Sequence, residues 1–198
     1  MVNYPNKKKN NHYTSMIEGK HNTAHRGMNL EEDINLTNEY YLSHDIAVIH
    51  KKPTPIQIVK VSYPERSSAK IVEAYFRTPS TTDYNGIYKG KYIDFEAKET
   101  KRQNFPFTNI SVHQIEHLRS IIKHQGIAFV IIAFTHLNEV YLIDASYIIE
   151  AYYQPNQKSI SYYAIKERGH LIEQGFNPRL NYLKIIDQYY LGGHENDK

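Results

Sequence analysis

The sequence predicts an α/β protein with one projecting β-hairpin, and three observations support this fold class. Capping-box patterns at Asn29 and Ser111 each precede a segment with helical periodicity. Residues 127–134 form a continuous apolar run, which is typical of a central strand. A first strand is expected at 46–50, and more than thirty residues separate it from Asp83, far beyond the usual connection. That insertion therefore has structure of its own or a specific role.

The insertion itself predicts the projecting hairpin. Residues 56–61 and 71–76 are strand-like, and the polar segment 63–68 between them has the composition of a turn. A second, shorter hairpin is expected from 84–88 and 92–97, which Lys89-Gly90 separates.

The remaining elements follow from local signals. The first helix has Asn29 as N-cap and Glu32 as the N3 residue, and a second runs over 111–125 with Gly126 as its stop. Residues 154–178 are expected to be irregular, with weak helical signals. Further elements are expected at 127–134 and 139–143 as strands, at 145–153 as a helix capped by Asp144, and at 182–191 as an amphipathic helix.

Composition favours one domain in a reducing compartment. The 198 residues are 40% hydrophobic, carry a net charge of +3 and include no cysteine, which excludes disulfides and thiolate metal sites. No apolar run is long enough to cross a bilayer, so no membrane is expected and the location is expected to be cytoplasmic. We expect a flexible basic arm over 1–25, a single domain over 26–191 that includes the projection at about 51–80, and a polar tail over 192–198.

The chemistry is concentrated in residues 81–101. If 92–98 is extended, Asp94, Glu96 and Lys98 share one face of the strand, and Asp83 stands at the start of its neighbour. Hard divalent cations bind carboxylate oxygens, and hydrolysis of a phosphodiester needs such a cation with a base or an amine that orients water. This spacing resembles the PD-(D/E)xK nuclease superfamily. A strand with a charged solvent face is the other interpretation.

Three further features have more than one interpretation. Glu31, in the first helical turn, either complements the helix dipole or points toward the metal site. Gln114 is either a capping-box residue or an amide that holds water or phosphate near the metal. His113-x-x-Glu116-His117 matches an inverted zinc-protease signature, but no third ligand is evident, so exposed or DNA-facing histidines are the other reading.

Positive charge is concentrated on the predicted projection. A narrow positive arm can enter the gap between converging phosphate backbones, and a dimerisation arm is a compatible alternative. Its basic residues are Lys51, Lys52, Lys60, Arg66, Lys70 and Arg77.

Longer blocks of sequence resemble RecU, the Holliday-junction resolvase family of Firmicutes and their relatives. The resemblance covers residues 26–190 and is strongest from His50 to Lys101. The blocks that resemble the family are RGMNLEED, HKKPTPIQIVKVSYPERS, EAYFRTPSTTDYNGIYKGKYIDFEAKETK and HQIEH. The segment RQNFPFTNIS, after Lys101, is shorter and less basic than the family pattern, which puts DNA contacts there in doubt.

The resemblance implies a restriction-endonuclease-like fold, a mixed central sheet flanked by helices with a projecting stalk. It implies a homodimer that cuts four-way DNA junctions with Mg²⁺ or Mn²⁺ during recombination and repair, with RecA and RuvAB as associated partners. Asp83, Glu96 and Glu31 would ligate the metal, Lys98 would orient the attacking water, and Gln114 would be a further active-site or DNA-contacting group. On the stalk, Arg66 and Tyr75 or Phe76 would be the main functional side chains.

Two other functions remain open at this point. A junction-binding scaffold that has lost cleavage would hold DNA for partners, and a site-specific endonuclease would cut unbranched duplex. Incubation with a mobile four-way junction and Mg²⁺ separates these hypotheses.

Overall fold

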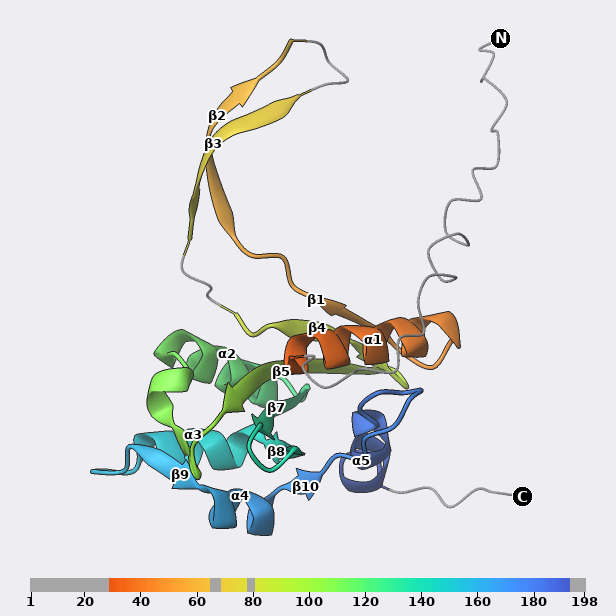
Figure 1. The fold of residues 1–198 in the computed structure, drawn as a ribbon, viewed down its shortest axis with the longest axis vertical. Coiled ribbons are helices and arrows are strands. Elements are labelled where there is room, and N and C mark those ends of the chain that lie inside the picture. Colours follow the sequence, from red (N-terminus) through yellow and green to blue (C-terminus); the bar gives the residue numbers. More distant parts are fainter. Residues whose placement is uncertain (1–28, 65–68, 78–80, 193–198) are drawn as a thin grey trace.

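The computed structural model describes residues 29–64, 69–77 and 81–192, and its centre is a six-stranded mixed sheet (Figure 1). The strand order is β1-β4-β5-β7-β8-β10. Only the β5–β7 pair is parallel within this sheet; the other pairs are antiparallel. The strands are β1 (Val48–Lys51), β4 (Tyr84–Tyr88), β5 (Lys91–Thr100), β7 (Ile127–Phe134), β8 (Glu139–Asp144) and β10 (His170–Leu171).

Helices cover both faces of the sheet, so two hydrophobic cores form. On one face, Ile93 and Phe95 of β5 pack with residues of α1 (Leu30–Ser43) and α5 (Tyr182–Tyr189). On the other face, alternate residues of β7 pack with α2 (Val112–Lys123), α3 (Ala145–Tyr153) and α4 (Tyr162–Arg168). The expected mixed sheet flanked by helices is confirmed. None of the helices in the described ranges is both long and apolar enough to span a membrane.

Local capping fixes the helix starts where the sequence placed them. Asn29 Oδ1 accepts a hydrogen bond from the Glu32 N–H at 2.9 Å, and Ser111 and Gln114 form a reciprocal capping box. The end of α2 differs in detail from the expected glycine stop. Gln125 takes the left-handed conformation, with φ 63°, and Gly126 is needed because a Cβ there would lie 2.6 Å from Ile121 Cγ2.

The projecting hairpin is also confirmed. Strands β2 (Ile56–Ser62) and β3 (Lys70–Phe76) pair antiparallel as a separate two-stranded ribbon, hereafter the stalk, which extends away from the sheet (Figure 1). Nearly all of its side chains in the described part of the ribbon are exposed. Residues 65–68, which include Arg66, lie outside the described residues.

Residues 154–178 contain more regular structure than expected. Ser159–Ser161 forms β9, which pairs with β6 (Asn104–Pro106), and α4 and β10 follow. A three-residue strand is too short to show a periodicity, and its partner lies more than fifty residues earlier in the chain. The remaining short element is the 3₁₀ helix Phe107–Asn109.

Candidate active site at the base of the stalk

A stack of aromatic rings sets the register of the two strands that form the site. Tyr84 and Phe95 are Cα partners of β4 and β5, and their rings stack with centroids 4.9 Å apart. Phe95 stacks in turn on Phe129 of β7, at 4.7 Å. The stack buries all three rings. Asp83 therefore enters β4 directly beside the stretch of β5 that begins at Glu96.

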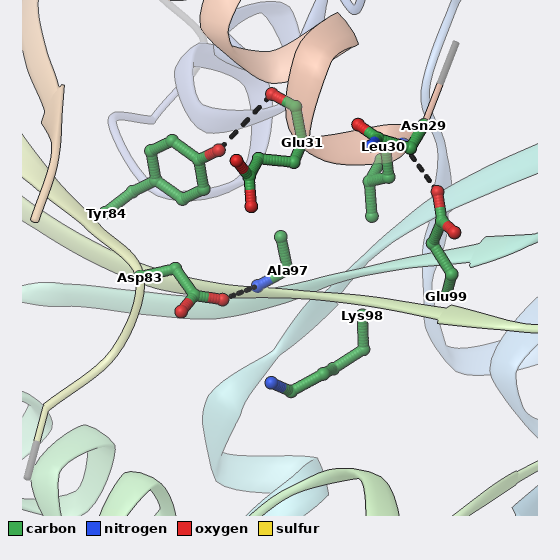
Figure 2. A pocket seen from close by; sticks show the side chains of 8 residues that line it. All are labelled: Asn29, Leu30, Glu31, Asp83, Tyr84, Ala97, Lys98 and Glu99. Atoms are coloured by element: carbon green, nitrogen blue, oxygen red, sulfur yellow. Dashed lines mark hydrogen bonds between the residues drawn. The ribbon is translucent and has the colours of Figure 1, made fainter. Parts of the chain in front are cut away.

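Asp83 turns toward that stretch of β5. The Ala97 N–H donates a long hydrogen bond, 3.4 Å, to Asp83 Oδ2 (Figure 2). The Asp83 carbonyl accepts from the Lys52 N–H at 2.7 Å, so the residue is also tied to the end of β1. Asp83 lies beyond the last β4–β5 pair, and β5 has no β4 partner from Glu96 onward. The Asp83 side chain thus takes the place of a β4 partner on this edge of β5.

Glu96 is buried beside Asp83 and Lys98. Its side chain has no exposed surface, and the Lys98 ammonium contacts Oε1 as an ion pair that lacks hydrogen-bond alignment, so both carboxyl oxygens have no hydrogen-bond partner. Burial, and after it the neighbouring Asp83 carboxyl group, raises the pKa of Glu96 to about 8, although Lys98 opposes the shift. The three groups that the sequence singled out therefore come together.

From the first turn of α1, Glu31 faces a pocket that Asp83 and Lys98 also line, whereas the buried Glu96 is not among the lining residues (Figure 2). The pocket has a volume of about 290 Å³, whereas one water in the liquid takes about 30 Å³, so a cation and a phosphate group fit. Glu31 is more than half exposed and pairs with Lys51 Nζ at 2.5 Å. The pocket is lined by Asn29, Leu30, Glu31, Asp83, Tyr84, Ala97, Lys98 and Glu99.

Two contacts hold the start of α1 over the site, and the sequence reasoning missed both. Glu99 of β5 accepts a hydrogen bond from the Leu30 N–H at 2.5 Å, which satisfies a free donor of the helix N-terminus. The Tyr84 hydroxyl donates to Asn35 Oδ1 at 3.1 Å. Glu99 follows the Glu-x-Lys motif by one residue, but only the position of α1 reveals its role.

The carboxyl groups of Asp83, Glu96 and Glu31 are of the chemical type that binds a divalent cation. Carboxylate oxygens are its preferred ligands. The buried oxygens of Glu96 have the Lys98 ammonium as an ion-pair partner but no aligned hydrogen bond, so a proton or a cation would stabilise them further. Within the described ranges, no three His, Cys, Asp or Glu side chains lie close enough together to enclose a metal ion as positioned. Glu31 is held by Lys51, so Asp83 and Glu96 form the compact part of the set.

The other motif residues have structural partners. Tyr153 donates a short hydrogen bond to Glu116, and His117 Nε2 lies 3.2 Å from Asp94 Oδ2, so no zinc-binding group forms from this stretch of α2. The Gln114 carboxamide oxygen accepts from the Ser111 N–H at 2.9 Å. This contact supports the capping interpretation of Gln114.

The basic and aromatic residues predicted to contact DNA divide into two groups. Most lie exposed on or beside the stalk, where Phe76 is 83% and Tyr75 is 61% exposed. Lys52 differs because its ammonium is turned into the protein, 2.7 Å from Asp94 Oδ2. The exposed group comprises Lys51, Lys60, Lys70, Tyr75, Phe76 and Arg77.

Comparison with known proteins identifies the family to which the chain belongs. The family model described as Recombination protein U matches residues 25–188. The Holliday junction resolvase RecU of Bacillus cytotoxicus is 54% identical over 196 residues, and that of Bacillus thuringiensis strain Al Hakam is 54% identical over 198; each comparison covers 96% of this chain and 98% of the relative. A solved structure of Hjc, a Holliday junction resolvase from Archaeoglobus fulgidus, matches with 9% identity and a TM-score of 0.42 over 70% of this chain and 94% of Hjc. The chain belongs to the RecU family.

Proposed function

We propose that the protein is a structure-selective endonuclease that hydrolyses phosphodiester bonds of four-way DNA junctions during recombination and repair. The observation that carries the proposal is the buried Glu96 carboxyl group, whose pKa the neighbouring Asp83 raises and whose Oε1 pairs with the Lys98 ammonium. The relatives that share 54% of its residues are named Holliday junction resolvases, which supports junction DNA as the substrate.

Each side chain of the site has a distinct part in the proposed reaction. Asp83 and Glu96 would hold a divalent cation, Mg²⁺ or Mn²⁺, with Glu31 as an outer acid released from Lys51. When bound, the cation supplies positive charge against the phosphate and the leaving oxygen. Lys98 lies at the Glu96 carboxyl group, where its ammonium can orient the attacking water or contact a phosphate oxygen. That Gln114 contacts water or DNA near the metal site stays a prediction.

The stalk supplies the proposed shape selectivity. It combines exposed apolar and aromatic side chains with basic residues, and such a surface is typical of a binding site. A narrow positive ribbon fits the point where four phosphate backbones converge, and stacking of Tyr75 or Phe76 on unpaired bases would add affinity. Junction geometry rather than base sequence would then determine where the enzyme binds.

Paired cuts require two sites, so we propose that two copies act together as a homodimer in the cytoplasm. Contacts with RecA and RuvAB are part of this proposal through the family resemblance alone. Sedimentation at micromolar concentration tests the dimer, because a monomer that cuts both strands symmetrically would contradict it.

A mobile four-way junction with a matched linear duplex tests the proposed activity. We expect symmetric nicks in the junction with Mg²⁺, no product with EDTA, and much slower cutting of the duplex. Junction binding without product at any protein concentration would indicate a scaffold. Equal rates on junction and duplex would indicate a duplex endonuclease.

A further inference from the structure

The two ends of the stalk meet at one buried carboxylate, Asp94. Asp94 Oδ2 accepts hydrogen bonds from Lys52 Nζ at 2.7 Å and from the Tyr92 hydroxyl at 2.9 Å, and His117 Nε2 lies at 3.2 Å. Oδ1 accepts a short hydrogen bond from the Thr82 hydroxyl. Asp94 has no exposed surface. Four side chains thus converge on one carboxylate.

These partners come from separate parts of the chain. Lys52 follows β1 and lies four residues before the stalk, and Thr82 lies six residues after it, immediately before Asp83. His117 belongs to α2, whereas Asp94 belongs to β5 and precedes Glu96 by two residues. Lys52 also joins the two stalk ends directly, because its Nζ donates to Thr82 Oγ1 at 2.8 Å. Two backbone hydrogen bonds support the same junction, from the Lys52 N–H to the Asp83 carbonyl at 2.7 Å and from the Arg77 N–H to the Pro55 carbonyl at 3.0 Å.

The cluster is built to keep Asp94 charged and fixed. Burial acts to raise the pKa of Asp94, but the hydrogen bonds from His117, Lys52 and Thr82 outweigh burial, so the pKa is lowered. An ionised buried carboxylate is costly unless its oxygens are paired, and loss of its charge would leave Lys52 without its ion-pair partner. Both oxygens of Asp94 accept hydrogen bonds, whereas the contact of Glu96 with Lys98 lacks hydrogen-bond alignment. Asp94 is therefore not a free metal ligand.

We propose that Asp94 is a positioning residue that clamps both ends of the stalk to the catalytic strand. The clamp sets the direction of the stalk, and it also sets the position of Asp83 through Thr82. Engagement of the stalk is thereby coupled to the placement of a site residue. The coupling to cleavage rests on the proposed function, whereas the control of stalk direction does not.

Distance measurement by pulsed electron paramagnetic resonance tests the clamp without DNA or metal. The chain contains no cysteine, so the changes Val72→Cys on β3 and Glu150→Cys on α3 introduce a single pair of spin labels at exposed positions. Labelled protein is diluted with excess unlabelled protein so that pairs between copies are rare. Asp94→Asn keeps the size of the side chain but removes the charged acceptor. We expect the width of the distance distribution to at least double.

A matched control separates clamping from general loosening. Asp33→Asn breaks another partly buried ion pair, Asp33 with Arg179 at 2.9 Å, and neither residue is a partner of Asp94. We expect this variant to melt at a lower temperature and yet keep the narrow distribution. An unchanged width in Asp94→Asn, or an equal broadening in Asp33→Asn, would overturn the proposal. If Asp94→Asn does not fold, Thr82→Val is used instead. It removes the hydrogen bond from Thr82 to Asp94 and must broaden the distance distribution.

A cleavage assay tests the coupling. At saturating protein, we expect Asp94→Asn to cut a four-way junction at least ten times more slowly than the unaltered protein. A full cleavage rate despite a broadened distribution would refute the coupling and keep the clamp. If the unaltered protein does not cut, the proposed function fails, and the spin-label comparison still decides whether Asp94 positions the stalk.

Discussion

The buried carboxyl group of Glu96 predicts a specific dependence of stability on pH. Its pKa in the fold is about 8, against an ordinary value of 4.5, chiefly because of burial and then because of Asp83. Between these two values the folded protein retains a proton that the unfolded chain has released. The free energy of unfolding therefore falls as pH rises through this window and levels off above it.

Glu96→Gln removes this titration while it keeps the size of the side chain. Each pH unit within the window changes the Glu96 contribution by about 1.4 kcal/mol, which gives about 3 kcal/mol between pH 5.5 and pH 8. Urea unfolding of both proteins in EDTA gives the free energies, and their difference cancels the groups that they share. We expect the variant to gain about 3 kcal/mol relative to the unaltered protein across this range.

Addition of Mg²⁺ extends the same experiment. A cation that binds the ionised pair stabilises only the folded state, so Mg²⁺ should stabilise the unaltered protein at pH 8 much more than at pH 5.5. The variant should respond weakly at both pH values. Free-energy curves for the two proteins that run parallel from pH 5.5 to 8 would refute this account of Glu96.

Three other predictions concern cleavage, the sheet and the stalk. Asp83→Asn should slow junction cleavage at least about 100-fold while binding in a gel-shift assay persists, because the cation is worth several kcal/mol in the transition state; an equal loss of binding would contradict the assigned role. Gly86→Ala should lower the free energy of unfolding by about 3 kcal/mol or more, because its Cβ would lie 2.1 Å from the Val48 carbonyl oxygen. The control Gly90→Ala meets no atom within 4 Å and should cost only about 1 kcal/mol from its positive φ, so equal losses in urea unfolding would refute the steric argument. Replacement of residues 63–70 by a two-glycine turn should reduce the ratio of junction to duplex affinity without a change in melting temperature, and an unchanged ratio would exclude the stalk as the element that recognises junction shape.

The parts of the fold that could be predicted from the sequence depend on neighbouring residues. Capping residues act three positions away, so Asn29 and Ser111 identified their helices. Alternation along β5 placed Glu96 and Lys98 on one face, and this follows from strand geometry alone. The short strand β9 could not be predicted in this way, because a partner distant in the sequence defines it.

In the candidate site, too, the contacts that could be predicted are local in the sequence and those that were missed are not. Asp83 and Glu96 were found because the hairpin between them is local and its spacing is familiar. The contacts of Asp94 were missed because its donors come from positions 52, 82 and 117, which only the tertiary fold brings together. Lys52 was predicted to contact DNA on the basis of its charge, whereas its burial beside Asp94 depends on how the stalk leaves the sheet.

The location of a bound cation tests the central claim most directly. In a crystal soaked in Mn²⁺, anomalous scattering should give a peak between the carboxyl groups of Asp83 and Glu96, and the peak should vanish in Glu96→Gln. A Mn²⁺ peak elsewhere, or an empty pocket at a concentration that saturates junction cleavage, would contradict the account.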